Sequence, residues 1–157
     1  LQPDASRYEM WESSLASRAG LAAAVRLCSA VGPDQVHARS RALAARLRAG
    51  LEKLGASRLV LCDAPPSFDE AVAARLGASR CAHVTFEAES TLRMPASDIH
   101  AALLRMRIGA SVSPPTHSFD ERQWARPKVV RLSPTYFNTE QEVDEVIAAV
   151  GDILRRA

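Results

Sequence analysis

The sequence has no long hydrophobic run and little net charge. No apolar stretch in its 157 residues approaches the roughly 20 residues that a membrane-spanning helix needs, so we expect no membrane segment. The net charge is only +2, and the charged residues are spread along the chain. Nucleic-acid-binding domains usually concentrate their basic residues in a patch. The distribution of charge therefore argues against nucleic acid as a partner.

The chain also has few cysteines and no pattern of metal ligands. Cys28, Cys62 and Cys81 are odd in number and form no Cys-x-x-Cys pair, which fits neither a disulfide framework nor a zinc site. The histidines show no ligand spacing either, so we expect no metal. We interpret all three cysteines as small buried hydrophobic residues in a reducing compartment, which indicates the cytoplasm.

The composition, with 47% hydrophobic and 24% charged residues, is typical of one folded domain. Residues 11–31 are rich in alanine and poor in charge, which predicts a largely buried helix that stops at Gly32 and Pro33. A second helix is expected from Asp34 to Gly55, because its apolar residues recur at spacings of three, four and seven. Residues 65–80 are expected to form a surface insertion with a short helix. Strands are expected at residues 59–61, 81–86, 108–112 and 128–133, with a helix from Pro95 to Leu104.

The clearest element is the last helix. Thr139 and Glu142 have the spacing of a capping box, and apolar residues then repeat at three and four over about four turns. One apolar face of this kind is suited to covering a sheet. The order helix, helix, strand, strand, helix, strand, strand, helix predicts an α+β fold with a small, mostly antiparallel sheet covered by helices.

Residues 129–144 read Val-Val-Arg-Leu-Ser-Pro-Thr-Tyr-Phe-Asn-Thr-Glu-Gln-Glu-Val-Asp. This segment resembles the signature near the end of class V aminotransferases and cysteine desulfurases, which are pyridoxal-phosphate enzymes. Arg7-Tyr8-Glu9, with its interval to Gly20, is similar to the Arg-Phe-Glu start of the small domain in that family, and residues 104–113 are similar to its helix, Arg-Gly-Ile turn and strand. The resemblance covers nearly the whole chain. It implies that residues 1–157 are the C-terminal small domain of a longer enzyme, whose large cofactor-binding domain is absent from this chain.

The resemblance also implies roles for individual residues. Arg131 is expected to receive the α-carboxylate of an amino-acid substrate, since a guanidinium fork can hold a planar carboxylate by two parallel hydrogen bonds. The alternative is an arginine that pairs with a surface carboxylate. Ser113 and His117 belong to a loop that would shape the pocket for the substrate side chain. His117 is either a proton carrier there or a flexible surface histidine.

Two departures from the family pattern bear on the expected phosphate contact and on the expected branch of the family. The Gly-Thr pair that binds the cofactor phosphate of a neighbouring subunit in desulfurases aligns with Trp11-Glu12, so either Ser13 or Ser14 takes over or the contact is absent. The loop over residues 113–120 has no cysteine, which argues against a persulfide-forming desulfurase. The branch that includes ergothioneine-pathway carbon-sulfur lyases and isopenicillin-epimerase-like proteins is the more similar one.

Only two lysines occur, and neither Lys53 nor Lys128 has the family's Ser-x-His-Lys setting. The chain is therefore expected to contain no catalytic residue of its own and to depend on pyridoxal phosphate bound by the large domain. Its expected partners are that large domain, an amino-acid substrate and a second copy in a homodimer. The alternative function is a non-catalytic structural or protein-interaction module, and a generic ferredoxin-like binding domain is a third possibility.

Overall fold

The computed structural model describes residues 3–8, 12–62, 81–114 and 127–157. The chain forms two compact units, Leu1–Val36 and His37–Ala157, and each is described here by itself. Among the described residues no single helix is long and apolar enough to cross a membrane. The helices α1 and α2 taken together are long and apolar enough, judged by length and composition only. The expectation that the chain is the small domain of a longer enzyme stays a prediction.

The first unit contains the short helix η1 (Ala5–Tyr8) and the helix α1 (Leu15–Val31). Ser14 caps α1, because its hydroxyl oxygen accepts a hydrogen bond of 3.2 Å from the backbone N–H of Ser17. No residue of α1 is buried, and its large apolar side chains, among them Leu15 and Leu27, are exposed. The prediction of a largely buried helix was therefore wrong. The described residues of this unit supply no second layer against which α1 can pack.

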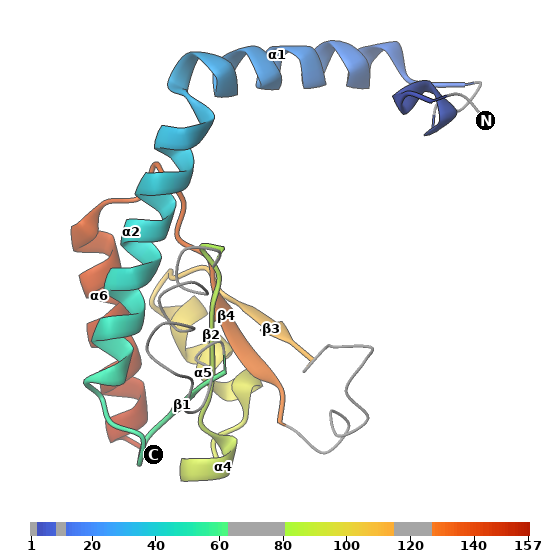
Figure 1. Cartoon of the computed structure of the whole chain (residues 1–157). Coiled ribbons are helices and arrows are strands. Elements are labelled where there is room, and N and C mark those ends of the chain that lie inside the picture. The colour runs from blue at the N-terminus through green and yellow to red at the C-terminus, as the bar shows by residue number, and fades with distance from the viewer. Residues whose placement is uncertain (1–2, 9–11, 63–80, 115–126) are drawn as a thin grey trace. The chain divides into compact units, whose positions relative to one another are not determined.

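The second unit is built on a four-stranded antiparallel sheet in the order β1-β2-β4-β3 (Figure 1). Its strands are β1 (Val60–Leu61), β2 (Val84–Glu87), β3 (Ser111–Ser113) and β4 (Val129–Leu132). They lie within one to three residues of the predicted positions. The α+β class and the small antiparallel sheet are thus confirmed.

Helices cover one face of this sheet. They are α2 (Pro33–Glu52), α5 (Ala96–Arg105) and α6 (Glu140–Arg155), and a further short helix, α4 (Glu89–Leu92), was not predicted. The capping box of α6 is present, with reciprocal hydrogen bonds between Thr139 and Glu142. The core between the layers contains Leu43, Leu47 and Leu51 of α2, Val84 and Phe86 of β2, Ile99 and Leu103 of α5, Val130 and Leu132 of β4, and Val143, Val150 and Leu154 of α6.

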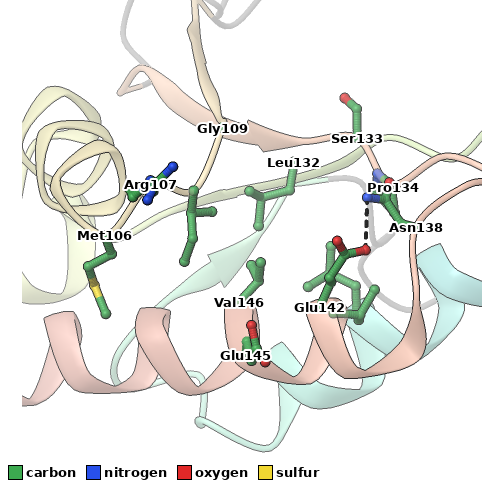
Figure 2. Close-up of a pocket in the computed structure, with 13 residues that line it drawn as sticks. Met106, Arg107, Gly109, Leu132, Ser133, Pro134, Asn138, Glu142, Glu145 and Val146 are labelled. Carbon is green, nitrogen blue, oxygen red and sulfur yellow. Dashed lines mark hydrogen bonds between the residues drawn. The ribbon is translucent and has the colours of Figure 1, made fainter.

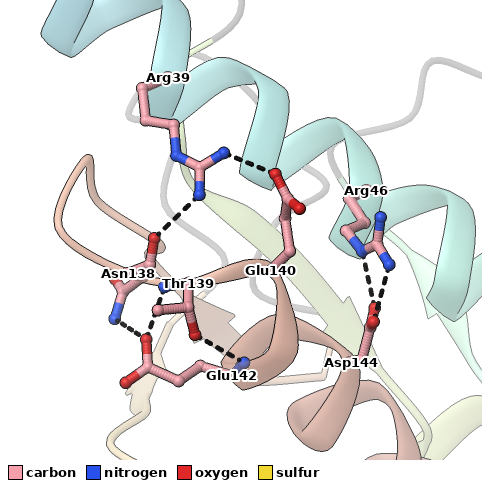
Figure 3. Close-up of polar contacts among 7 residues, drawn as sticks. All are labelled: Arg39, Arg46, Asn138, Thr139, Glu140, Glu142 and Asp144. Carbon is pink, nitrogen blue, oxygen red and sulfur yellow. Dashed lines mark hydrogen bonds and ion pairs between the residues drawn. The ribbon is translucent and has the colours of Figure 1, made fainter.

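The helices α2 and α6 lie side by side (Figure 1). They run in the same direction, since Arg39 pairs with Glu140, Arg46 pairs with Asp144, and Gly50 lies against Ile147. A Cβ atom at residue 50 would stand 2.2 Å from Cδ1 of Ile147, so glycine allows the close approach. Figure 3 shows the two ion pairs at the N-terminal end of this contact.

The interpretation of the cysteines as buried residues was wrong. Cys28, Cys62 and Cys81 are all exposed. Cys28 belongs to α1, which buries none of its residues, and the other two lie just outside the ends of β1 and β2. Their positions at strand ends explain why strand-like sequence around them did not mean burial. The expected surface insertion at residues 65–80 lies outside the described residues.

Candidate functional site

Arg131 lies on the face of the sheet that points away from the core. In β4 the buried residues Val130 and Leu132 alternate with half-buried Val129 and exposed Arg131. Because side chains of successive strand residues point to opposite faces, the guanidinium of Arg131 is directed away from the helices. The motif that carries the family resemblance therefore places its arginine where a ligand can approach the sheet.

Arg131 is the centre of a row of polar residues across three strands. The register of the sheet places Thr85 of β2 on one side of it and Ser111 of β3 on the other. Directly paired residues in antiparallel strands have Cα atoms about 4.5–5.5 Å apart, so both hydroxyl groups lie near the base of the arginine side chain. A planar anion that the guanidinium holds could also accept from these hydroxyls.

A histidine and a serine extend this row in the strand direction. Nδ1 of His83 lies 2.9 Å from Oγ of Ser133, within hydrogen-bond distance. Both residues fall on the same side of the sheet as Arg131, two positions along β2 and β4. We refer to His83, Thr85, Ser111, Arg131 and Ser133 together as the polar face. Its chemistry suits an anion with further hydrogen-bonding groups, such as the carboxylate end of an amino acid.

The polar face was only partly predicted. Arg131 was expected from its motif, whereas the sequence predicted no role for His83. The alternation of His83 and Thr85 with buried Val84 and Phe86 is a signal that could have identified the pair before the structure was known. Ser133 belongs to the Arg-x-Ser motif, but its partner became visible only with the strand register.

The other expected site residues are placed as follows. Ser113 is half-buried at the end of β3, opposite Val129, on the same side of the sheet as Arg131. His117 lies outside the described residues. Ser14 is engaged in capping α1, and Oγ of Ser13 accepts a hydrogen bond of 3.5 Å from Arg18. Both belong to the first unit, so whether they contact a cofactor stays a prediction.

Neither lysine of the chain belongs to the polar face. Lys53 follows the last residue of α2 and is exposed. Lys128 is exposed just before β4, and by strand alternation it points to the side opposite Arg131. The donor set on the polar face fits a carboxylate group. Within residues 3–8, 12–62, 81–114 and 127–157 there is also no group of three or more metal-ligating side chains.

Comparison of the sequence with family models and with curated proteins finds no match. Among solved structures, the chain is similar to part of a cysteine desulfurase from Thermococcus onnurineus NA1, in its apo form, with a TM-score of 0.76 and 18% sequence identity. The similarity covers 100% of this chain and 35% of that one. It shows that the two share a fold, and the chain spans about a third of the length of the desulfurase.

Proposed function

We propose that this chain is the substrate-carboxylate-binding small domain of a pyridoxal-phosphate-dependent enzyme related to the class V aminotransferases. The observation that carries the proposal is the position of Arg131, at the centre of the polar face on the side of the sheet away from the core. The likeness of the fold to part of a cysteine desulfurase supports it. The fold alone does not assign carboxylate binding to Arg131. The resemblance of the motif around Arg131 supports that role.

In this proposal the chain binds and orients, and the chemistry takes place elsewhere. Arg131 holds the α-carboxylate of an amino acid through two parallel hydrogen bonds, and Thr85 and Ser111 limit the directions that the guanidinium can take. The pair of His83 and Ser133 lies beside it and can accept or donate a hydrogen bond to the rest of the substrate. Pyridoxal phosphate, bound by a large domain, supplies the electron sink for a carbon-sulfur lyase or related reaction.

The loop over residues 113–120 carries no cysteine, so the proposed reaction is not the formation of a persulfide on that loop. Ser113 and His117 would shape the pocket for the substrate side chain. A homodimer in the cytoplasm remains part of the proposal, with Ser13 or Ser14 reaching the cofactor phosphate of the neighbouring subunit.

The decisive experiment replaces Arg131 in the parent enzyme. Arg131→Ala should raise KM for the amino-acid substrate about tenfold or more, because hydrogen bonds to charged groups contribute roughly 1.5–3 kcal/mol. The cofactor absorbance should not change. Arg131→Lys keeps the charge but loses the fork, so it should recover only part of the affinity. Arg46→Ala, which alters the pair between α2 and α6, is the control and should leave KM unchanged. An unaltered KM in Arg131→Ala would refute the proposed role.

A non-catalytic interaction module is the second candidate, and the exposed apolar side chains of α1 favour it. The intact mass and the absorbance of the protein from its natural source separate the two functions. A mass well above 17.0 kDa with cofactor absorbance supports the enzyme. A mass of 17.0 kDa, with no absorbance after addition of pyridoxal phosphate, supports the module.

A further inference from the structure

The guanidinium of Arg131 has no hydrogen-bond or ion-pair partner within residues 3–8, 12–62, 81–114 and 127–157. By strand alternation, Glu87 at the end of β2 lies on the same side of the sheet. Glu87 is only 6% exposed, and its two carboxylate oxygens accept hydrogen bonds from Ser90, one from the backbone N–H at 2.9 Å and one from the hydroxyl. Because Glu87 is engaged in this way at the start of α4, the cation of Arg131 stays available to a ligand.

His83 is held on the polar face from two directions. Its Nδ1 lies 2.9 Å from Oγ of Ser133, which stands opposite it across β2 and β4. The side chain of Ser133 points away from α6, whereas that of Leu132 points towards it (Figure 2). Arg48 of α2 donates hydrogen bonds to the carbonyl oxygens of His83, at 2.7 Å, and of Cys81, at 3.3 Å. The backbone of His83 and one of its ring nitrogens are therefore fixed.

The second ring nitrogen of His83, Nε2, is available to a ligand. Among the described residues, Nδ1 is the only ring atom of His83 with a hydrogen-bond partner. The hydroxyl of Ser133 can donate to Nδ1 or accept from it, so it accommodates both the neutral and the charged ring. Nε2 carries a hydrogen in the charged ring, and also in the neutral ring when Ser133 is the donor. His83 can thus donate a hydrogen bond to an anion whether or not the ring is charged.

His83 and Arg131 are diagonal neighbours on adjacent strands. Thr85 lies directly opposite Arg131, and His83 comes two residues before Thr85. Diagonal neighbours have Cα atoms roughly 7–8 Å apart, and strand side chains stand roughly perpendicular to the sheet. A carboxylate whose two oxygens lie in the guanidinium fork is too far from the imidazole to satisfy it as well. The separation instead suits two charge-assisted hydrogen bonds of about 2.8 Å with a short carbon chain between their acceptors.

We propose that His83 is a specificity-determining residue and that the substrate is an amino acid with a second acidic group on a short side chain. This inference rests on the proposed function, in which Arg131 holds the α-carboxylate. Nε2 of His83 donates a hydrogen bond to the acidic group of the side chain, and Ser133 orients the ring through Nδ1. An uncharged side chain of the same length lacks this charged acceptor, so it should bind more weakly.

The test is calorimetric titration of the parent enzyme with succinate and with butyrate. The two probes have carbon chains of the same length, but only succinate carries a second carboxylate. Neither has an amino group, so both report on the polar face without reacting at the cofactor. Succinate should bind about tenfold more tightly or more, because it gains a hydrogen bond to a charged group. Equal affinities for the two probes would overturn the inference, and so would the absence of saturable succinate binding.

Variants of His83 separate this inference from the proposed role of Arg131. His83→Ala should weaken succinate binding about tenfold and leave butyrate binding unchanged, whereas Arg131→Ala should weaken both. His83→Gln keeps a side-chain N–H donor, so it should recover part of the affinity for succinate. His37→Ala is the matched control, because His37 is an exposed residue of α2 and does not belong to the polar face.

The two proposals fail in different ways. Normal succinate binding in His83→Ala, or an equal loss of both probes, would overturn the specificity role of His83. If Arg131→Ala still weakened both probes, the proposed function would stand. Unchanged binding of both probes in Arg131→Ala would refute the proposed function, and with it the inference.

Discussion

Arg46 of α2 donates two hydrogen bonds of 2.7 Å to the carboxylate of Asp144 on α6 (Figure 3). Two turns earlier on α2, Arg39 donates a bond of 2.7 Å to Glu140 and one of 3.3 Å to the carbonyl oxygen of Asn138. The two arginines thus pair with carboxylates one turn apart on α6. These contacts fix the register of the parallel helices that lie over the sheet.

Removing the contact between Arg46 and Asp144 should lower stability slightly and in a salt-dependent way. Both side chains are about half exposed, so water and ions screen the attraction between them. The variants Arg46→Ala and Asp144→Asn, with the double variant, form a thermodynamic cycle that isolates their coupling. We expect a favourable coupling in urea unfolding at low salt that disappears near 1 M salt, where the Debye length is about 3 Å. A coupling that salt does not change would mean that the pair acts through packing.

The unit that contains α6 should lose stability in acid. Hydrogen bonds from Arg39, Thr139 and Arg46 lower the pKa of Glu140, Glu142 and Asp144, respectively, below the ordinary values of 4.5 for glutamate and 3.8 for aspartate. A lowered carboxyl pKa in the folded state stabilises the fold above the ordinary pKa. That contribution is lost as the pH falls through the lowered values.

Urea midpoints should therefore be constant from pH 7 to about pH 5 and fall below about pH 4.5, where protons begin to bind the unfolded chain first. The double variant Glu140→Gln, Asp144→Asn should show a shallower fall, because two of the three groups no longer titrate. An identical pH profile in the double variant would contradict the assignment of acid sensitivity to these carboxylates.

Gly50→Ala and Gly20→Ala should change stability in opposite directions. A Cβ atom at residue 50 would meet Cγ1 of Ile147 at 2.8 Å as well as its Cδ1, and overpacking of this kind costs about 1–3 kcal/mol. A helix-propensity gain of about 1 kcal/mol offsets part of this cost. A Cβ atom at residue 20 would meet no described atom within 4 Å apart from the local backbone of its own helix, so the propensity gain is not offset and the helix signal in circular dichroism should rise. Stabilisation by Gly50→Ala would show that Ile147 moves aside freely.

The sequence alone was sufficient to predict the elements that follow a local pattern. The apolar period of α6 and the capping box of Thr139 and Glu142 depend on residues within a few positions of one another, and both are present in the structure. The short helix α4 was missed because Glu89–Leu92 spans barely one turn, too few residues to show a period. Local pattern therefore predicted the layers of the fold but not its shortest connection.

Contacts between segments that are far apart in the sequence were harder to predict. His83 and Ser133 are fifty residues apart, and only the register of β2 and β4 brings them together. The burial of α1 was predicted from its composition, but burial depends on whether another layer is available, which composition cannot show. Arg131 was found through its motif, whereas the positive φ of Arg107 was not predicted, because a positive φ at a non-glycine residue leaves no mark in the sequence.

Phe86→Ala should be strongly destabilising, because Phe86 is fully buried at the centre of the sheet. Truncation of a buried phenylalanine usually costs about 3–5 kcal/mol, through lost apolar burial and the cavity that remains. Phe137→Ala is the matched control, since that ring is 71% exposed and forms an edge-to-face contact with Tyr136. Its cost should stay within about 1 kcal/mol. Urea unfolding of both variants measures the difference, and similar costs would contradict the location of the core.

Arg107→Gly should make the chain more stable. The φ of 62° is strained for arginine and free for glycine, so the substitution should add roughly 1 kcal/mol to the free energy of unfolding. Arg93→Gly, at a φ of 54°, should give a similar gain. Urea unfolding of the unmodified chain and the two variants measures the effect. If Arg107→Gly lowers stability instead, the arginine side chain makes a stabilising contact that outweighs the backbone strain.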